Sequence, residues 1–392
     1  MPAPPALIVA WARSPVAPLG GAFGQLSPHG LAAPVVQALL QRAGLDPQDV
    51  DAIVAGNALG AGGNPARLVG LAAGLPERCA SYSIDTQCCS GLDAVSLGAG
   101  LIASGQASIV VAGGVEAWSR SPIRMHRPRH PGEEPEAYER PAFAPDPRRD
   151  PDMLVSAARY ALLHRHTRAQ QDSYAILSHR RALEHRDLSS AEIVPVAGVD
   201  RDQYPRALDA ARAARLPAVV KATELGLETD SEQPDCSLSA LTVSAKADGA
   251  AFVLLATPGA CDRLGLSGKA EWVGATAVGG DPGTPLVTAA LAARQALDHA
   301  GIPSPQELHS VELHDAFAVQ GLSFCEALDL SPERINRLGG GLARGHPIGA
   351  SAAIALVRLL ADLWREGAPG DLGLTAVAGA GGIGSAAVLR RR

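Results

Sequence analysis

Short apolar runs alternate along the chain with longer segments in which apolar residues recur every three to four positions. The short runs predict strands and the periodic segments predict amphipathic helices. The predicted strands are Leu7–Ala10, Ala52–Ala55, Ile109–Ala112, Ala251–Leu255, Ser310–Leu313 and Leu374–Ala378. The predicted helices are Leu31–Ala43, Gly91–Ala103, Met153–His166, Gln170–Glu184, Thr288–Ala300 and Ala350–Trp364. Strands that alternate with helices indicate βαβ units, so we expect an α/β fold with a largely parallel, buried sheet.

An internal repeat links two distant parts of the chain. Residues 43–50, Ala-Gly-Leu-Asp-Pro-Gln-Asp-Val, are echoed by residues 300–308 with one inserted residue. Each copy follows a predicted helix and leads into a predicted strand. Residues 88–114 and 345–382 share a second plan, in which a Gly-rich turn precedes a helix, a strand and another Gly cluster. Two matches in the same order indicate that the chain holds two copies of one α/β unit.

The segment between the copies has a different character. Residues 120–152 are rich in Pro, Arg, His and Glu and have almost no apolar periodicity, which predicts an extended loop. The basic run at residues 120–130 is followed by four glutamates, so we interpret it as a solvated or subunit-bridging loop rather than a site for phosphates or an acidic partner. We assign residues 1–119 and 240–267 to an N-terminal half, 120–239 to a loop or cap domain, and 268–392 to a C-terminal half.

The composition is that of a globular protein and excludes several classes. Of the 392 residues, 47% are hydrophobic and 19% charged, and the net charge of −6 argues against a nucleic-acid partner held by overall charge. Neither a signal-peptide pattern nor a run of about 18 apolar residues is present, so we expect a cytoplasmic protein without membrane association. The 42 glycines and 30 prolines are unusual, because they indicate many tight turns and close backbone approaches.

The six cysteines include one adjacent pair, Cys88 and Cys89. None has the CxxC spacing of a metal site, so we expect no bound metal, and a long chain needs no disulfides. The pair opens the helix predicted from Gly91. Unpaired N–H groups and the helix dipole favour a thiolate there, and hence a lowered pKa. From these residues alone, a nucleophile and a small buried core residue are equally good interpretations of Cys88.

Three other segments carry candidate chemistry. His346 lies in the Gly-rich turn 339–349 before a helix, where it could take a proton from a cysteine opposite it or be structural. His314 ends a predicted strand, where the end of a parallel strand meets the crevice. The N–H groups of residues 379–384 could hold an oxyanion or form a tight turn. Phosphate-loop and dinucleotide-binding motifs are incomplete.

Together these segments resemble the thiolase family of acyl-CoA acyltransferases over nearly the whole chain. The order and spacing of the motifs carry the resemblance. They include Gly63-Asn64-Pro65-Ala66-Arg67, Gln87-Cys88-Cys89-Ser90-Gly91-Leu92, Gly113-Gly114-Val115-Glu116, Asp248-Gly249-Ala250-Ala251 and Gly345-His346-Pro347-Ile348-Gly349-Ala350-Ser351. The resemblance implies a duplicated five-layered α/β/α/β/α thiolase fold with an inserted loop domain that covers CoA. It also implies acyl-CoA and CoA as substrates, no separate cofactor, and a homodimer or homotetramer.

The resemblance further implies roles for individual residues. The cysteine matching Cys88 takes the acyl group from CoA as a thioester, and the histidine matching His346 activates it and donates to an oxyanion hole. Backbone N–H groups of Cys88 and Ala380 form a second oxyanion hole. Cys89 stands where the family has a small residue, so we interpret it as a packing residue. The residues that match the pantetheine path are Ser244, Phe317 and Met153.

Two departures from the family pattern bear on the mechanism. The family usually has Asn-Glu-Ala-Phe where this chain has His314-Asp315-Ala316-Phe317. Its usual Cys-x-Gly-x-Gly lines up with residues 378–382, so the second catalytic cysteine is replaced by Ala378. The sterol-carrier branch of the family supplies that thiol from a His-Asp-Cys-Phe motif, but the corresponding residue here is Ala316.

These departures leave three functional hypotheses. The first is an acyl-CoA C-acyltransferase that forms or cleaves 3-ketoacyl-CoA through a Cys88 acyl-enzyme, with His314 or a water as the base that the α-proton requires. In the second, Cys88, His314 and His346 reproduce the Cys-His-His set of the ketoacyl synthases. The chain then condenses an acyl group with a malonyl-type donor by loss of CO₂, or transfers it to another nucleophile. The third is a weakly active structural or partner subunit, against which the retained Cys88 and His346 argue.

Overall fold

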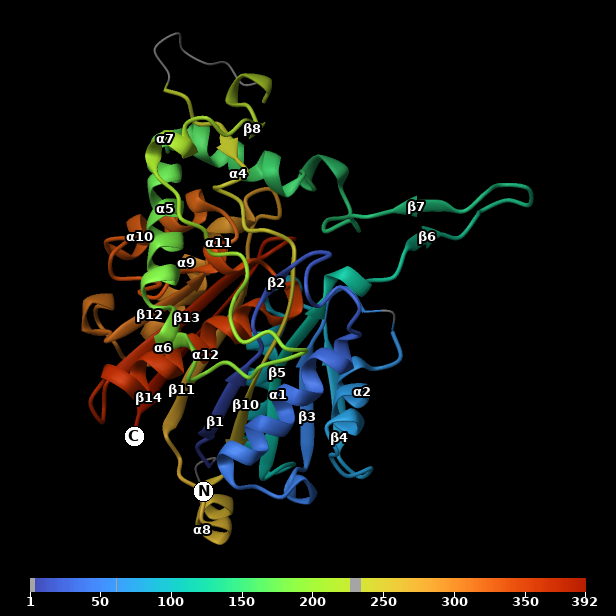
Figure 1. The fold of residues 1–392 in the computed structure, drawn as a ribbon, viewed down its shortest axis with the longest axis vertical. Coiled ribbons are helices and arrows are strands. Elements are labelled where there is room, and N and C mark those ends of the chain that lie inside the picture. The colour runs from blue at the N-terminus through green and yellow to red at the C-terminus, as the bar shows by residue number, and fades with distance from the viewer. Residues whose placement is uncertain (1–3, 61, 226–233) are drawn as a thin grey trace.

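The computed structural model describes residues 4–60, 62–225 and 234–392 (Figure 1). Within these residues, ten strands form one mixed sheet. Its strands are β1 (Leu7–Arg13), β2 (Ala17–Pro18), β3 (Ala52–Gly56), β4 (Ala80–Ile84), β5 (Ile109–Ala117), β10 (Ala247–Ala256), β11 (Ala270–Gly279), β12 (Ser310–His314), β13 (Leu372–Gly379) and β14 (Ile383–Arg391). Along the sheet the order is β12-β13-β14-β11-β1-β10-β5-β3-β4, and the short β2 pairs with β10.

Six of the helices agree with the predicted ones to within a few residues at each end, and the other helices of the described residues were not predicted. At the start of the first helix, Pro28 occupies the first turn and the Ser27 side chain accepts the N–H of Gly30, and Gly44 ends the helix in the left-handed conformation. The helices are α1 (Pro28–Ala43), α2 (Pro65–Ala72), α3 (Ser90–Ala103), α4 (Met153–Leu163), α5 (Arg168–Glu184), α6 (Arg186–Ser189), α7 (Ala210–Ala213), α8 (Pro258–Leu264), α9 (Thr288–His299), α10 (Ala318–Leu328), α11 (Gly341–Arg344) and α12 (Ile348–Glu366). The six that were predicted are α1, α3, α4, α5, α9 and α12.

The topology confirms the predicted duplication. Strands β1, β3, β5 and β10 of the first copy correspond to β11, β12, β13 and β14 of the second, and each set lies in the sheet in the same order. In each copy the second and third strands pair in parallel and the remaining pairs are antiparallel. The helices correspond as well, because α1 and α9 precede the second strand while α3 and α12 precede the third. Strand β4 is an addition at the edge of the first copy.

The expectation of a largely parallel sheet is wrong. In the described part of the chain, parallel pairing joins β3 to β4 and β5, and β12 to β13, whereas the other pairs are antiparallel. One reason is the hairpin between β13 and β14, whose turn contains Gly381 and Gly382 with positive φ. Another is the long excursion after β5, which returns the chain as antiparallel β10.

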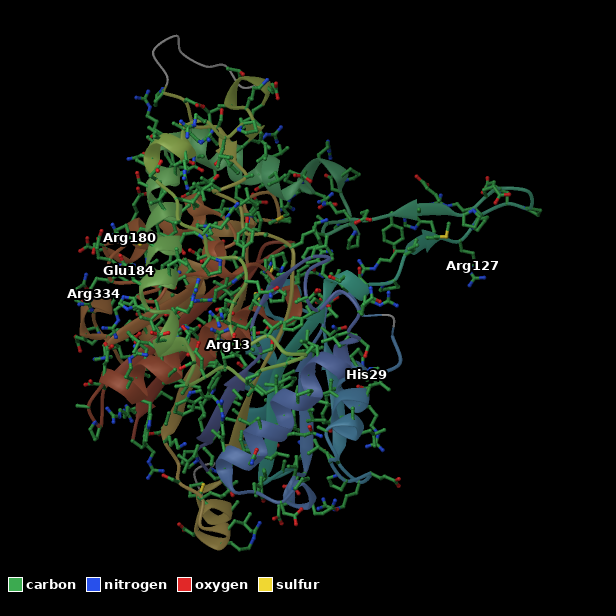
Figure 2. The ribbon with its side chains drawn as sticks, in the orientation of Figure 1. Arg13, His29, Arg127, Arg180, Glu184 and Arg334 are labelled. Carbon is green, nitrogen blue, oxygen red and sulfur yellow. The ribbon has the colours of Figure 1, made fainter. Side chains whose placement is uncertain are left out.

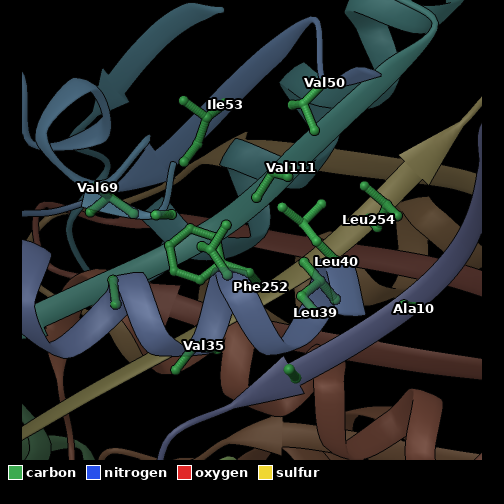
Figure 3. Close-up of a cluster of buried hydrophobic side chains, with 14 of the residues drawn as sticks. Ala10, Val35, Leu39, Leu40, Val50, Ile53, Val69, Val111, Phe252 and Leu254 are labelled. Carbon is green, nitrogen blue, oxygen red and sulfur yellow. The ribbon is translucent and has the colours of Figure 1, made fainter. Parts of the chain in front are cut away.

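Three of the four clusters of buried hydrophobic side chains in the described residues lie between the expected five layers, and the fourth surrounds α4. The first packs α1 on one face of the first copy's strands and includes Leu39, Val111 and Phe252 (Figure 3). The second surrounds α3 and α12, which contact strands of both copies and so form the central layer. The third packs α9 and α10 on the strands of the second copy.

The two copies approach each other backbone to backbone near the centre of the molecule. A Cβ added to Gly114 would lie 2.0 Å from the carbonyl oxygen of Gly349, and one added to Gly56 would lie 2.7 Å from the same atom. A larger residue at either position would push the copies apart. The start of α12 is therefore held directly against the ends of β3 and β5.

The inserted segment packs mainly on the second copy. Helices α4 and α5 contact α10, and a buried ion-pair network that includes Arg13, labelled in Figure 2, ties the segment to both copies. In that network Glu192 pairs with Arg13 of β1 at 2.7 Å and also with Arg358 of α12. The basic run leads into β6 (Arg124–His126) and β7 (Glu136–Tyr138), which form an arm that projects from the body (Figure 1). Within the described residues, no helix is long and apolar enough to cross a membrane.

Candidate functional site

Cys88 lies in a single 3₁₀ turn, residues 87–89, between β4 and α3. The residue before it, Gln87, has φ 52°, a left-handed conformation that side chains other than glycine rarely adopt. The turn is held by Ser90, whose hydroxyl accepts the N–H of Thr86 at 2.9 Å and donates to the carbonyl of Gln87 at 2.6 Å. Cys88 is 9% exposed, so its thiol is almost inaccessible to solvent.

His346 occupies the equivalent place in the second copy, two residues before α12 as Cys88 is two residues before α3. The preceding Gly345 has φ 107°, and a Cβ there would lie 2.9 Å from the Cβ of Ala247. The backbone N–H of His346 donates to Ala245 at 2.7 Å. This geometry brings the His346 Nε2 to 3.1 Å from the Cys88 Sγ.

The other ring nitrogen of His346 contacts Ser351 on the first turn of α12. The Ser351 hydroxyl donates to the carbonyl of Pro347 at 3.0 Å and lies 2.7 Å from His346 Nδ1. Because the hydroxyl proton is used on Pro347, the hydroxyl oxygen accepts from Nδ1–H. Nε2 is then unprotonated and faces the thiol as an acceptor.

The electrostatics of the pair differ from the sequence-based expectation of a lowered thiol pKa. Burial raises the pKa of Cys88 to about 12, although the N–H groups of Ala380 and Cys88 act in the opposite direction. Burial also lowers the pKa of His346 to about 4. For both groups, the loss of hydration on burial shifts the pKa more than nearby dipoles do. This explains why the position of Cys88 at a helix terminus does not lower its pKa. The resting pair is therefore a neutral thiol beside a neutral imidazole.

His314, at the end of β12, stacks on His346. The ring centroids are 4.4 Å apart and the planes differ by 29°. The stack needs Gly341, since a Cβ there would lie 2.8 Å from His314 Cε1. Burial, reinforced by His346 and by the cation of Arg344, lowers the pKa of His314 well below its usual value. Its Nε2 is buried and has no hydrogen-bond partner among the described residues.

The turn between β13 and β14 closes the other side of the Cys88 thiol. The backbone N–H groups of Ala380 and Cys88 lower the pKa of this thiol, against the larger effect of burial. Ala378, at the end of β13, is 8% exposed, and β13 contacts the 87–89 turn. Cys89 is fully buried, with its Sγ 3.9 Å from the carbonyl of Val377. All six cysteines are free and buried.

The loop before His346 is fixed by polar side chains that the sequence alone did not single out. Asp315 accepts the N–H of Gly341, and Ser178 accepts that of Gly340 at 2.9 Å. Arg344 is 4% exposed; it donates to the carbonyl of Gly339 and lies 3.7 Å from Glu312. These bonds hold the His346 loop against β12.

The structural role of Glu116 was also not predicted from the sequence. Its buried carboxylate accepts the N–H of Gly349 at 3.0 Å, which anchors the start of α12, and it also accepts donors from residues 57–59. Burial raises its pKa to about 7, although the backbone N–H donors oppose the shift. The signal in the sequence was the motif Gly-Gly-Val-Glu at residues 113–116, whose glutamate follows the glycine packed on Gly349.

Of the three residues matched to the pantetheine path, Ser244 contacts the loop before His346, and Phe317 and Met153 belong to one hydrophobic cluster. The Ser244 hydroxyl donates to the carbonyl of Gly341 at 2.7 Å. Phe317 is 7% exposed and belongs to a hydrophobic cluster with α4. Met153, the first residue of α4, packs against the same cluster and is half-buried.

Comparisons with known proteins identify the family to which this geometry belongs. Residues 6–258 match the model of the thiolase N-terminal domain, and residues 266–391 match that of the thiolase C-terminal domain. The chain belongs to the thiolase family.

Individual thiolases resemble the chain over its full length. It is 34% identical to an acetyl-CoA acetyltransferase of Chromobacterium violaceum over 392 residues, covering 98% of this chain and 99% of the relative. A second acetyl-CoA acetyltransferase, from Pseudomonas aeruginosa, is also 34% identical, with 96% and 97% covered. Among solved structures, the acetyl-CoA acetyltransferase of Bacillus anthracis superposes with a TM-score of 0.87 at 31% identity, covering 100% and 99%. The Acat5 thiolase of Ascaris suum, solved with coenzyme A, has a TM-score of 0.86 at 28% identity, covering 99% and 100%.

Proposed function

We propose that this thiolase is an acyl-CoA C-acyltransferase that forms or cleaves 3-ketoacyl-CoA through an acyl group carried on Cys88. The contact between Cys88 Sγ and His346 Nε2, at 3.1 Å, carries the proposal. A thiol with a raised pKa needs a base that takes its proton as the sulfur attacks, and an unprotonated Nε2 at this distance supplies one. Full-length similarity to acetyl-CoA acetyltransferases supports the substrate class.

Acylation follows from this arrangement. The thiol proton passes to His346 Nε2 while Sγ attacks the thioester carbonyl, and the N–H groups of Cys88 and Ala380 stabilise the oxyanion. The intermediate collapses by breaking the bond to the CoA sulfur, which leaves as the thiol with the proton from His346. Cys88 then holds the acyl group as a thioester. Ser244, Phe317 and Met153 line the proposed pantetheine path.

The carbon–carbon step needs a different proton transfer. The α-carbon of an acetyl thioester must lose a proton before it attacks the acyl-enzyme, and in the reverse direction it must regain one. Ala378 has no acidic proton, so we assign this transfer to His314 or to a water bound beside it. The enolate attacks the acyl carbonyl, the bond between that carbon and Cys88 Sγ breaks, and the released thiolate takes up the proton that was removed from the α-carbon. The unpartnered, neutral Nε2 of His314 supports the assignment.

The stack of His314 on His346 also supports a second candidate function, decarboxylative condensation. A malonyl-type donor forms its carbanion by losing CO₂, so no base is required. A neutral His314 that carries its proton on Nε2, which has no other partner among the described residues, would donate a hydrogen bond to the enolate oxygen. The Cys88–His346 pair would carry the acyl group in the same way in both reactions.

One experiment distinguishes these functions from each other. The purified protein is mixed with acetyl-CoA alone, with acetoacetyl-CoA and CoA, or with acetyl-CoA and malonyl-CoA, and the Cys88 peptide and the products are followed by mass spectrometry. Acyl-Cys88 with thiolysis of acetoacetyl-CoA supports the first function. A condensation product only when malonyl-CoA is present supports the second. Cys88→Ser must abolish the adduct, while Cys89→Ala, which removes the neighbouring thiol, must leave it.

A chain that no acyl-CoA acylates would refute both functions and favour a structural subunit.

We further propose that two copies of the chain associate through β4. This edge strand has a partner on one side, β3, in the described residues, and apolar Tyr82 and Leu97 are 45% and 52% exposed beside it. An exposed edge with apolar neighbours is covered in stable proteins. We also propose that residues 1–119 and 240–267 form the N-terminal half of each copy of the chain, residues 120–239 its loop domain, and residues 268–392 its C-terminal half. Sedimentation of the protein and of Tyr82→Lys tests the dimer, since a charge in that interface should yield the monomer.

A further inference from the structure

Asp93, on the first turn of α3, accepts hydrogen bonds from hydroxyl groups in both copies of the duplicated unit. The Thr86 hydroxyl donates to Asp93 Oδ2 at 2.6 Å, and the Ser385 hydroxyl of β14 donates to Oδ1, also at 2.6 Å. Ser385 is 2% exposed, so its bond is shielded from solvent. The carboxylate thereby links two segments that are 299 residues apart in the sequence.

The Thr86 bond acts on the turn that carries the nucleophile. Thr86 precedes Gln87, whose φ of 52° is a strained conformation that the surrounding structure must hold in place. The turn carries Cys88, whose backbone N–H is one of the two donors assigned to the oxyanion. Thr86 therefore anchors the strained segment from its N-terminal side, two residues from that N–H.

The Ser385 bond acts on the turn that carries the second N–H. Ser385 lies directly opposite Val377 in the β13–β14 pairing, and the hairpin between them contains Ala380. Cys89 fills the space on the same side, because a Cβ on Gly379 would lie 3.2 Å from its Sγ. The hairpin is thus packed on Cys89 and tied to α3 through Asp93.

We propose that Asp93 is a positioning residue that sets the separation of the Ala380 and Cys88 N–H groups by holding their two turns through Ser385 and Thr86. The inference deepens the proposed function, because these are the two donors assigned to the oxyanion. Such donors act only when they lie about 2.7–3.1 Å from the oxyanion. A displacement of about 1 Å can cost about 100-fold in rate.

The test removes either hydroxyl without changing a charge. Ser385→Ala and Thr86→Val lose a bond to Asp93, whereas Ser385→Thr and Thr86→Ser keep a hydroxyl. Ser310→Ala is the matched control for stability, because the Ser310 hydroxyl donates to the buried Asp362 at the same 2.6 Å, at the opposite end of β12 from His314. Two rates are measured for each protein, acylation of Cys88 by acetyl-CoA and alkylation of Cys88 by iodoacetamide as a function of pH.

We expect Ser385→Ala and Thr86→Val to lower the acylation rate about tenfold with little change in the KM for acetyl-CoA. We also expect their alkylation profiles to move to higher pH, with about threefold slower alkylation at pH 8, because an N–H group that lowers the pKa of the Cys88 thiol is displaced. The hydroxyl-bearing variants and Ser310→Ala should resemble the wild type in both rates. In an Asp93→Ala background, Ser385→Ala should add nothing further, because its acceptor is already absent.

Alkylation profiles of Ser385→Ala and Thr86→Val that coincide with that of Ser310→Ala would overturn the positioning role. So would equal losses of acylation in all three variants, which would indicate a general loss of stability. Alkylation needs no acyl transfer, so it decides the role of Asp93 even if the wild-type protein is not acylated. Absence of wild-type acylation by any acyl-CoA would overturn the proposed function alone.

Discussion

The Ser351 hydroxyl accepts the Nδ1–H of His346 at 2.7 Å and thereby leaves Nε2 free to face the thiol. Without this acceptor, no hydrogen bond from Nδ1–H to Ser351 stabilises the tautomer of His346 that carries its proton on Nδ1. In the other tautomer Nε2 is protonated and cannot take the thiol proton. We expect Ser351→Ala to slow acylation of Cys88 by about 10- to 100-fold. Ser351→Thr keeps a hydroxyl at this position and should retain most of the acylation rate. Stopped-flow measurement of Cys88 acylation by acetyl-CoA compares the two variants. Equal rates for the two variants would contradict the tautomer assignment.

The raised thiol pKa predicts how Cys88 reacts with iodoacetamide. Because its pKa is about 12 and that of His346 about 4, the thiolate fraction increases throughout the neutral range. The alkylation rate should rise about tenfold for each pH unit between pH 6 and 9, as the reactive species is the thiolate. Rates are measured by mass spectrometry of the Cys88 peptide. A plateau across this interval would indicate a thiolate with a lowered pKa and would refute the neutral pair.

Ala378→Cys introduces a thiol where the family places its second catalytic cysteine. If the alignment is correct, the new thiol supplies the α-proton transfer, and thiolysis of acetoacetyl-CoA should increase by at least about tenfold. Acylation by acetyl-CoA should stay near the wild-type rate, because that step does not use the second thiol. Ala378→Ser, of similar size but without an acidic thiol, is the control. No gain in thiolysis from the cysteine variant would count against the alignment.

Burial of Glu116 predicts a specific dependence of stability on pH. Its pKa rises from 4.5 to about 7 on folding, mainly by burial, so unfolding releases a proton between these values and stability falls as the pH rises. The full effect corresponds to about 3 kcal/mol. Glu116→Gln cannot ionise, so its free energy of unfolding should fall less between pH 5 and 8 than that of the wild type. Urea denaturation measures both, and the exposed Glu307→Gln should behave like the wild type.

Much of the fold could be read from the sequence, because buried strands and amphipathic helices leave local patterns. The six predicted strands lie within observed ones, and the repeat at residues 43–50 and 300–308 marks equivalent positions. Strands β11 and β14 escaped notice, since their small and mixed residues form no clear apolar run and they are stabilised by pairing with each other. Strand direction was also misjudged, because it depends on where the chain returns after the inserted segment.

The sequence predicted that Cys88 and His346 would face each other, but it did not predict the pKa values of the two groups. Cys88 and His346 stand out locally, as each precedes a helix in a turn of small residues. The pKa of Cys88 could not be inferred from its position at a helix terminus, since its burial depends on segments distant in the sequence. The same holds for Asp93 and Glu116, whose partners lie on other strands and helices.

Cys88 and His346 stand at corresponding positions of the duplicated unit, and their reaction partners therefore come one from each copy. Two identical units joined in this way would set cysteine against cysteine or histidine against histidine. Such a pair has either no base or no nucleophile. The proposed chemistry thus depends on a difference between the two copies, because one copy supplies the nucleophile and the other supplies the base. Substitutions that make the two halves more alike near this axis should erode catalysis even where they preserve the fold.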